Sequence, residues 1–531
     1  MTEKNYIGDD ISLGRQSALI LAAKVFGFAL NFVLPILIVR FLTQDEVGAY
    51  RQIFLVIGNA LAILPFGMGM SAYYFLSREE EYRRPAVLNI VAFFTVVGGI
   101  AFLVFALYPG LLDRLFRHGE LTDLAALGGL VIWVWLISSF LEIVALANRE
   151  VKIATAFIVF AQLSKAALMI ASIYFFASAE GFLYAAIVQG LVQLAVLLYY
   201  LRSRFAGFLR TFDIAFLRRH LGYSIPFGLT AILWVLQTDL HSYFVGYKFT
   251  PAEYAIYAYG CFQLPLFGLI TDSLTSVMIP RISRLQMQGD KREILRITAR
   301  GMEKMSLLFF PFYVFLLILA EPFIIMLFTR EYAGSVPIFI INLTLIPTFV
   351  WINDPTIRAF PELGRFLVVQ RCVSFLLLMA TLLIGIQYFE PIHFITVVIV
   401  VALLEKMVLT AAVLKKLGPE RSDLRFLKRP GLTALASVAA GAAVFIFHGL
   451  ASTYIFSGAQ TVWAAVSPGA SGSLLDSIAN AMILFACGMI FLPVYLLVSH
   501  RLNLFDPSDI AYAKSLLQRA VPRWRWSGSG H

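Results

Sequence analysis

The feature that most constrains this chain is a succession of long apolar runs separated by short polar segments. A helix that crosses a bilayer needs about 20 mainly apolar residues, and runs of that length recur along nearly the whole sequence. Only 14% of the 531 residues are charged, whereas soluble domains carry about 25%. So few charges cannot cover a water-facing surface, and the sequence therefore predicts an all-α polytopic membrane protein.

We expect about fourteen transmembrane helices from these runs. The first run is too long for the core of a signal peptide, and we expect it to remain as the first spanning helix. The predicted spans are 17–42, 47–76, 86–111, 122–147, 153–178, 181–201, 222–247, 252–280, 304–328, 333–357, 364–388, 391–414, 431–455 and 477–499.

The basic residues support this layout because their number alternates from one connecting segment to the next. With a cytoplasmic N-terminus, the inside segments hold most of the 42 Lys and Arg residues and the outside segments hold few. Cytoplasmic loops of membrane proteins collect such residues. The sequence therefore predicts a multi-pass protein of the cell inner membrane with both termini cytoplasmic. The net charge of +10 needs no nucleic-acid partner, and none is expected.

Two turns share a pattern although six helices separate them. The stretches FLTQDEVGAY (41–50) and KFTPAEYAIY (248–257) both carry a Thr followed three residues later by a Glu. This spacing is typical of a capping box at a helix start, so we expect the second and eighth helices to begin there. An even number of intervening helices returns the chain to the same side. Helices 1–6 and 7–12 are therefore predicted to be parallel repeats about an axis along the membrane normal.

The repeats predict the domain boundaries. We expect an N-terminal six-helix lobe (1–201), a cytoplasmic inter-lobe linker (202–221), a C-terminal six-helix lobe (222–416), an extra pair formed by helices 13 and 14 (417–500) and a basic cytoplasmic tail (501–531). The basic segment 281–304 is expected to form a short amphipathic helix on the inner membrane surface.

The sequence lacks the short motifs of ATP-driven or enzymatic chemistry. It contains no G-x-x-x-x-G-K-[ST], G-x-S-x-G or H-E-x-x-H stretch. Its three cysteines, Cys261, Cys372 and Cys487, match no metal-binding spacing. We therefore expect neither an enzyme nor a metal or cofactor site, and paired six-helix repeats favour transport.

Polar residues inside the spans are the candidate transport residues, because such residues are costly in lipid and often line a pathway. The candidate substrate contacts in a central cavity are Lys24, Asn31, Lys165, Arg371 and Lys406. A cavity with several cations and few anions suits an anionic ligand such as a phosphate or pyrophosphate. The alternative for Lys165 and Arg371 is a structural role or snorkelling to the interface.

Helix 7 contains the most polar stretch of any span, LQTDLHSYFVGY (236–247). Asp239 in this stretch and Glu405 in helix 12 are candidates to bind a coupling Na⁺ or proton. Gln237, His241 and Asp272 are further polar intramembrane residues. A hydrogen-bonded structural role is the alternative for Asp239, and Asp272 could instead bring helices close together.

Three stretches together resemble the polysaccharide transporter family of the multidrug/oligosaccharidyl-lipid/polysaccharide exporter superfamily. They are RFLTQDEVGAYRQI (40–53), QTDLHSYFVGYKFTPAEYAIYAYG (237–260) and the turn ANREVK (147–152). The resemblance extends over roughly residues 10–415. It implies an alternating-access flippase that moves a polyprenyl-pyrophosphate-linked oligosaccharide across the bacterial inner membrane. By this resemblance, Lys24 and Arg51, with Gln52 beside them, would hold the pyrophosphate, and Asp239 would bind the coupling cation.

The resemblance leaves the substrate and two rival functions open. Lipid II flippases carry several arginines in the first two helices, where this chain has Lys24 and Arg51. This departure favours an O-antigen, capsule or exopolysaccharide repeat unit. The expected partners are the lipid-linked oligosaccharide, membrane lipids, and a polysaccharide polymerase with its chain-length regulator. The alternatives are a MATE-like cation-coupled exporter of small molecules and a non-transporting scaffold of a polysaccharide synthase complex.

Overall fold

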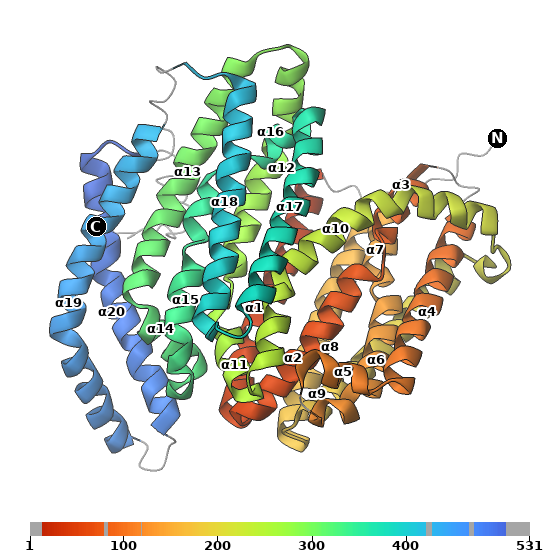
Figure 1. Cartoon of the computed structure of the whole chain (residues 1–531), viewed down its shortest axis with the longest axis horizontal. Helices are drawn as coiled ribbons and strands as arrows, with labels where there is room; N and C mark the ends of the chain where they lie inside the picture. Colours follow the sequence, from red (N-terminus) through yellow and green to blue (C-terminus); the bar gives the residue numbers. More distant parts are fainter. Residues whose placement is uncertain (1–12, 79–82, 118, 421–426, 467–471, 506–531) are drawn as a thin grey trace, which may run out of the picture. The chain divides into compact units, whose positions relative to one another are not determined.

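The computed structural model describes residues 13–78, 83–117, 119–420, 427–466 and 472–505. Every regular element within these ranges is a helix (Figure 1). Eleven helices of the described residues are long and apolar enough to cross a membrane. The prediction of an all-α polytopic membrane protein is confirmed.

The candidate spans cover most of the apolar runs found in the sequence. They are Leu19–Phe41, Arg83–Leu107, Leu121–Ala147, Val151–Phe175, Ala179–Arg204, Lys291–Ile318, Arg330–Val350, Pro361–Gly385, Pro391–Leu417, Lys428–Tyr454 and Gly472–Arg501. The predicted runs 47–76, 222–247 and 252–280 are not among them. A total of fourteen spans is compatible with this set and stays a prediction.

The chain forms two compact units, and the first contains residues 1–265, 327–342 and 365–405. Its helices are α1 (Leu13–Phe41), α2 (Gln44–Ile63), α3 (Met68–Arg78), α4 (Arg83–Leu107), α5 (Gly110–Phe116), α6 (Glu120–Ser138), α7 (Phe140–Ala147), α8 (Val151–Phe175), α9 (Ala179–Arg204), η1 (Phe208–Arg210), α10 (Ile214–Lys248), α11 (Pro251–Gly260), η2 (Arg330–Ser335), most of α15 (Val336–Leu343), most of α17 (Pro361–Gly385) and the first part of α18 (Pro391–Leu417). These units are defined by contacts between segments, whereas the predicted domains follow the repeats in the sequence. The predicted domain boundaries therefore stay a prediction.

The predicted run 47–76 is divided between α2 and α3. Pro65 is followed by Phe66 and Gly67, whose φ angles are 45° and 75°, and a left-handed backbone interrupts a helix. Gly67 also has no room for a side chain, because a Cβ there would lie 2.6 Å from the carbonyl oxygen of Ser224 in α10. The turn therefore packs its backbone directly against α10.

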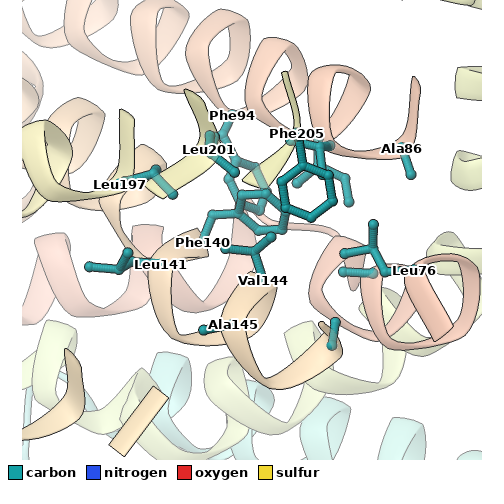
Figure 2. Packing of buried hydrophobic residues seen from close by; sticks show 14 of the residues in the cluster. Leu76, Ala86, Phe94, Phe140, Leu141, Val144, Ala145, Leu197, Leu201 and Phe205 are labelled. Atoms are coloured by element: carbon teal, nitrogen blue, oxygen red, sulfur yellow. The ribbon is translucent and has the colours of Figure 1, made fainter. Parts of the chain in front are cut away.

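The N-terminal helices of the first unit share one apolar core, shown in Figure 2. Phe94 of α4, Phe140 and Val144 of α7, and Leu201 of α9 are each at most 1% exposed. Burying a large apolar side chain contributes about 1.5–3 kcal/mol. The short helix α7 is therefore anchored in the core, and the backbone positions of its polar residues are fixed.

The segment between α9 and α10 belongs to the same core. Phe205 and Phe208 are at most 5% exposed. The Asn89 side chain of α4 donates a hydrogen bond to the Asp213 carbonyl oxygen at 2.8 Å, and the Asp213 amide donates to Asn89 Oδ1 at 3.4 Å. The predicted inter-lobe linker, 202–221, is therefore packed onto the N-terminal helices.

A buried histidine lies at the start of α10, before the predicted span 222–247. His220 is fully buried, and its ring centroid lies 4.4 Å from that of Phe75 and 4.3 Å from that of Phe216. Neither ring nitrogen has a hydrogen-bond partner in the part of the chain that the structure describes. This environment favours the neutral imidazole.

Both Thr-x-x-Glu turns form capping boxes, as predicted. The Thr43 hydroxyl accepts from the Glu46 amide at 3.4 Å, and the Glu46 carboxylate accepts from the Thr43 amide at 2.9 Å. The corresponding distances for Thr250 and Glu253 are 3.3 and 2.9 Å. The pattern therefore begins α2 and α11 in the same way.

The two capped helices also touch each other. Asp45 Oδ1 accepts a hydrogen bond from the Ala252 amide at the start of α11 at 3.2 Å. One turn further along α2, a Cβ on Gly48 would lie only 1.9 Å from the Pro251 carbonyl oxygen. The backbones of α2 and α11 therefore cross at a distance that only glycine permits at position 48.

The second unit contains residues 266–326, 343–364 and 406–531. Its helices are α12 (Pro265–Met287), α13 (Lys291–Ile318), most of α14 (Ala320–Phe328), η3 (Ile346–Val350), α16 (Asp354–Ala359), α19 (Lys428–Val466), α20 (Gly472–Arg501) and the last part of α18. Helix α19 packs against both α20 and α13. Small buried residues such as Ala436 and Ala440 allow the close approach. The predicted helices 13 and 14 correspond to α19 and α20.

The basic segment 281–304 does not form a separate short helix, contrary to expectation. Helix α12 continues to Met287 and α13 begins at Lys291. The segment therefore consists mainly of the ends of two long helices, which extend beyond the ends at 280 and 304 that the sequence predicts.

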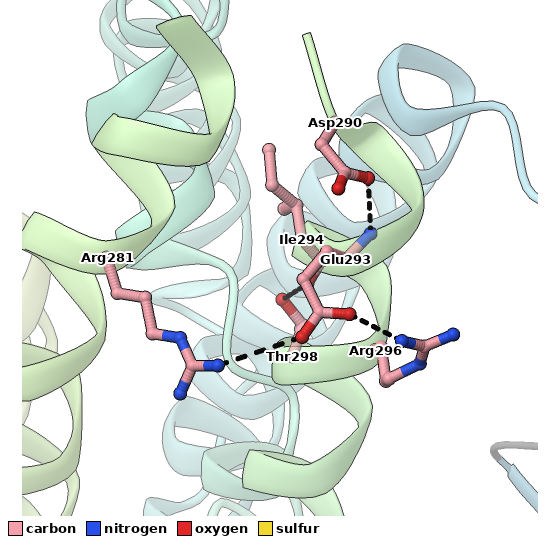
Figure 3. A network of polar contacts seen from close by, with 6 residues as sticks. All are labelled: Arg281, Asp290, Glu293, Ile294, Arg296 and Thr298. Carbon is pink, nitrogen blue, oxygen red and sulfur yellow. Dashed lines mark hydrogen bonds and ion pairs between the residues drawn. The ribbon is translucent and has the colours of Figure 1, made fainter. Parts of the chain in front are cut away.

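A polar network joins these two helix ends (Figure 3). The Asp290 carboxylate accepts from the Glu293 amide at 2.9 Å and caps α13. The Glu293 carboxylate lies 2.6 Å from an Arg296 nitrogen and 3.7 Å from an Arg281 nitrogen of α12. Exposed pairs of this kind stabilise weakly, but this one fixes the turn between α12 and α13.

Candidate functional site

The first candidate, Lys24 of α1, has a carboxylate partner. Its Nζ lies 3.5 Å from Glu142 Oε1 of α7, and the two side chains are 47% and 41% exposed. Leu141 and Val144 on α7 are buried in the core, so the helix presents Glu142 on its other side. Lys24 is therefore a partly accessible cation whose charge is balanced by a neighbouring anion.

A polar contact continues along the same face of α1. Asn31 Nδ2 donates to Gln162 Oε1 of α8 at 3.1 Å. Gly27 makes this approach possible, because a Cβ there would lie 2.8 Å from Gln162 Cγ. Lys24, Gly27 and Asn31 are three and four residues apart and share one helix face. Asn31 thus ties α1 to α8 while lying in line with Lys24.

Lys165 lies one turn after Gln162 on α8. Its Nζ lies 5.4 Å from the centre of the Trp135 ring, a geometry in which the ring attracts a cation. The indole nitrogen of Trp135 donates to the Ala186 carbonyl oxygen at 2.8 Å, which fixes the ring. Within the described part of the chain, no ion pair joins Lys165 to a carboxylate.

Arg51 of α2 also rests on an aromatic ring. Its guanidinium carbon lies 4.5 Å from the centre of the Tyr259 ring, and Tyr259 is fully buried. The Nε of Arg51 is buried and has no hydrogen-bond partner among the described residues. The neighbouring Gln52, also fully buried, donates to the Gly246 carbonyl oxygen of α10 at 3.4 Å. Gln52 therefore links two helices, whereas Arg51 keeps its positive charge against the Tyr259 ring.

A third cluster joins α10, α17 and α18. Gln237 Nε2 donates to Glu405 Oε2 at 2.6 Å, and Arg371 Nε lies 3.9 Å from Glu405 Oε1. Gln370 donates to the Glu405 carbonyl oxygen at 2.7 Å, and the Arg371 guanidinium lies 4.9 Å from the Trp234 ring centre. The proposed substrate residue Arg371 and the proposed coupling residue Glu405 therefore balance each other's charge.

Asp239 lies on α10 beside this cluster but has different neighbours. It interacts with the side chain of Asn59, whose Nδ2 also donates to Tyr243 Oη at 3.0 Å. No ion pair joins Asp239 to a cation among the residues that the structure describes. His241 is 6% exposed, and its Nδ1 lies 2.6 Å from Tyr257 Oη. Asp239 is thus the acidic candidate without a resident cation, and His241 makes a buried structural contact.

Two further candidates lie in the second unit. Asp272 is exposed on α12. The Lys406 carbonyl oxygen accepts a hydrogen bond from Thr410 at 2.8 Å, and Thr410 in turn accepts from Asn353 at 2.8 Å. These contacts organise the last part of α18 within that unit.

The geometry differs in one respect from the expected cavity of several cations and few anions. Lys24 and Arg371 each have a carboxylate within 4 Å, so only part of the expected positive charge is available to a ligand. Lys165 and Arg51 instead lie on aromatic rings, which leave the cations' net charge in place.

Sequence reasoning missed Glu142, Trp135 and Tyr259 as partners of these cations. Glu142 had a signal, since it is an acidic residue within an otherwise apolar run. The two aromatic residues had none, because 14% of the chain is aromatic and such residues occur throughout the spans.

Comparison with protein-family models gives a match over residues 37–337, more than half of the chain, to the family described as polysaccharide biosynthesis protein. This chain belongs to that family. The resemblance drawn from residues 40–53, 147–152 and 237–260 is thereby confirmed. A search of curated protein sequences finds no significant match.

Solved structures share the fold at low sequence identity. The lipid II flippase MurJ, in an inward closed conformation, matches with a TM-score of 0.63 at 14% identity, covering 94% of this chain and 100% of that one. A transporter of the MOP superfamily from Pyrococcus furiosus gives 0.54 at 14% identity, with 76% and 95% covered. The Vibrio cholerae MATE transporter VcmN, in its bent form, gives 0.50 at 16% identity, with 78% and 97% covered. The chain therefore has the fold shared by MurJ and the MATE transporters.

Proposed function

We propose that this protein is an alternating-access flippase for a polyprenyl-pyrophosphate-linked oligosaccharide. The observation that carries the proposal is the partly accessible Lys24, which shares a face of α1 with Asn31, in a chain of a polysaccharide biosynthesis family. Lys165 and Arg51 support it, because each keeps its positive charge without a carboxylate partner among the described residues. Charge-assisted hydrogen bonds from such cations suit phosphate oxygens.

The proposed cycle begins with the sugar-pyrophosphate head at Lys24 while the polyprenyl tail stays in lipid. The two lobes then exchange access from the cytoplasmic to the outer side of the bacterial inner membrane. Binding of the anionic head must favour one arrangement of the lobes, since a ligand shifts an equilibrium only through its differential affinity. The cargo in this proposal is an O-antigen, capsule or exopolysaccharide repeat unit, and no enzymatic step is involved.

A coupling cation, Na⁺ or a proton, is assigned in this proposal to Asp239 rather than Glu405. Glu405 already has Arg371 and Gln237 as partners. Asp239 interacts with the neutral side chain of Asn59 and forms no ion pair among the residues that the structure describes. A polymerase and its chain-length regulator would act on the delivered repeat unit at the outer surface, and both termini would be cytoplasmic.

The test is reconstitution in liposomes with a fluorescent polyprenyl-pyrophosphate oligosaccharide. Wild-type protein should move the probe between leaflets, and Lys24→Ala should slow this movement at least tenfold. Lys291→Ala, which removes an exposed lysine at the start of α13, is the matched control and should leave the rate unchanged. A wild-type rate in Lys24→Ala would remove Lys24 from the mechanism.

A MATE-like exporter of cationic small molecules is the second candidate, favoured by the fold shared with VcmN and by the unpaired Asp239. The same liposomes, loaded with a fluorescent organic cation, separate the two functions. Cation movement that depends on Asp239, with no movement of the lipid-linked probe, would favour the exporter. Movement of neither probe would favour a scaffold of a polysaccharide synthase complex.

A further inference from the structure

The Lys24–Glu142 pair raises a question that the proposed function leaves open, and this inference rests on that function. A membrane contains many anionic phospholipids whose head groups carry a single phosphate charge. A lone, partly exposed lysine would attract all of them. Lys24 is not alone, because Glu142 lies 3.5 Å from its Nζ and is itself 41% exposed.

The pair changes what a ligand gains by binding. An anion that approaches Lys24 is attracted by the ammonium group and repelled by the carboxylate at a similar distance. A singly charged head group therefore exchanges one anion for another at Lys24 and gains little. A diphosphate carries at least one charge more than the carboxylate that it displaces, so its net attraction to Lys24 survives the exchange.

The fold keeps Glu142 at this position. Helix α7 begins immediately after the break at Ser139, and its buried residues Leu141, Val144 and Ala145 anchor it in the apolar core of Figure 2. The backbone of Glu142 therefore stays in place, and only its side chain can turn away when a ligand enters. A carboxylate at this position repels an incoming anion as well as pairing with Lys24.

We propose that Glu142 sets the minimum charge that a head group must carry to bind at the Lys24 site. It makes the site accept a diphosphate head group and reject the monoanionic head groups of bulk phospholipids. Glu142 thus supplies the repulsive half of recognition, whereas Lys24 supplies the attractive half.

The test compares two soluble probes, farnesyl pyrophosphate and a short-chain phosphatidylglycerol. Binding to purified full-length protein in phosphatidylcholine nanodiscs is measured by titration calorimetry. Wild type should bind the pyrophosphate at least tenfold more tightly than the phosphatidylglycerol. Glu142→Gln keeps the size of the side chain and removes its charge, so no ion pair has to be displaced and phosphatidylglycerol should bind about tenfold more tightly than it binds to wild type. Lys24→Met should lose the pyrophosphate.

Two controls separate charge from structure. Glu142→Asp retains the charge and should keep phosphatidylglycerol binding close to the wild-type value, which a purely structural role of the long side chain would not predict. Glu180→Gln removes an acidic residue in the first turn of α9 and should also leave phosphatidylglycerol binding at the wild-type value. Unchanged phosphatidylglycerol binding in folded Glu142→Gln protein would overturn this inference while leaving the proposed function intact. Failure of wild type to bind farnesyl pyrophosphate would instead overturn the proposed function, and this inference with it.

Discussion

Replacing Gly48 by alanine tests the close crossing of α2 and α11. The added Cβ would lie 1.9 Å from the carbonyl oxygen of Pro251, 2.3 Å from its carbonyl carbon and 2.8 Å from its Cα. All three atoms belong to the backbone, so no side chain can rotate away to relieve the contact. The two helices must separate by more than an ångström at this point.

The expected loss of stability combines three effects. Overpacking of this kind costs about 1–3 kcal/mol. Separation of the helices also weakens the hydrogen bond from the Ala252 amide to Asp45, which contributes about 1 kcal/mol. Alanine regains about 0.5–1 kcal/mol relative to glycine within a helix. The free energy of unfolding of Gly48→Ala should therefore fall by about 1–3 kcal/mol.

Gly58→Ala is the matched control, because it lies on the same helix and its added Cβ would meet no atom within 4 Å. Unfolding of both variants and wild type in detergent, followed by tryptophan fluorescence, gives the comparison. Gly58→Ala should match or exceed wild type, whereas Gly48→Ala should unfold at lower temperature. Equal stability of the two variants would refute the argument from backbone proximity.

Three further perturbations probe other contacts. Arg371→Gln leaves Glu405 without its cation and should cost about 3 kcal/mol in denaturant unfolding, whereas adding Glu405→Gln should restore most of that loss. Asp45→Ala removes the acceptor for the Ala252 amide at the start of α11 and should cost about 1 kcal/mol in the same assay, and no change would show that water replaces the carboxylate. Burial, with a smaller contribution from Arg219, lowers the pKa of His220 to about 4, so the unfolded chain binds the proton more readily. The free energy of unfolding should therefore be highest above pH 6.5 and should fall by up to about 3 kcal/mol as the pH decreases towards 4. His220→Phe should remove this decrease.

The local features of the fold could be predicted from the sequence because their causes are local. A capping box joins residues three positions apart, so Thr43 with Glu46 and Thr250 with Glu253 were readable. Most of the candidate spanning helices were readable from apolar length alone. The break at Pro65 and Gly67 also left a signal, a proline and a glycine two residues apart, which a search for long apolar runs passes over.

The partners within the candidate site could not be predicted in the same way. Lys24 and Glu142 lie on helices far apart in the chain, and no spacing rule connects them. A count of intramembrane cations therefore overstated the positive charge available to a ligand. The aromatic partners of Lys165 and Arg51 are invisible for a different reason, since a ring that binds a cation has the same sequence signal as one that packs against lipid.

The docked segment between α9 and α10 has a consequence for any attempt to divide this protein. A break near Gly207 would leave Phe208 and Phe216 on the C-terminal fragment and the apolar surfaces that bury them on the N-terminal one. Trypsin should cut slowly after Arg210 in this segment, because the backbone must first detach from the core. The boundary predicted between the two repeats would thus not separate two independently folding pieces.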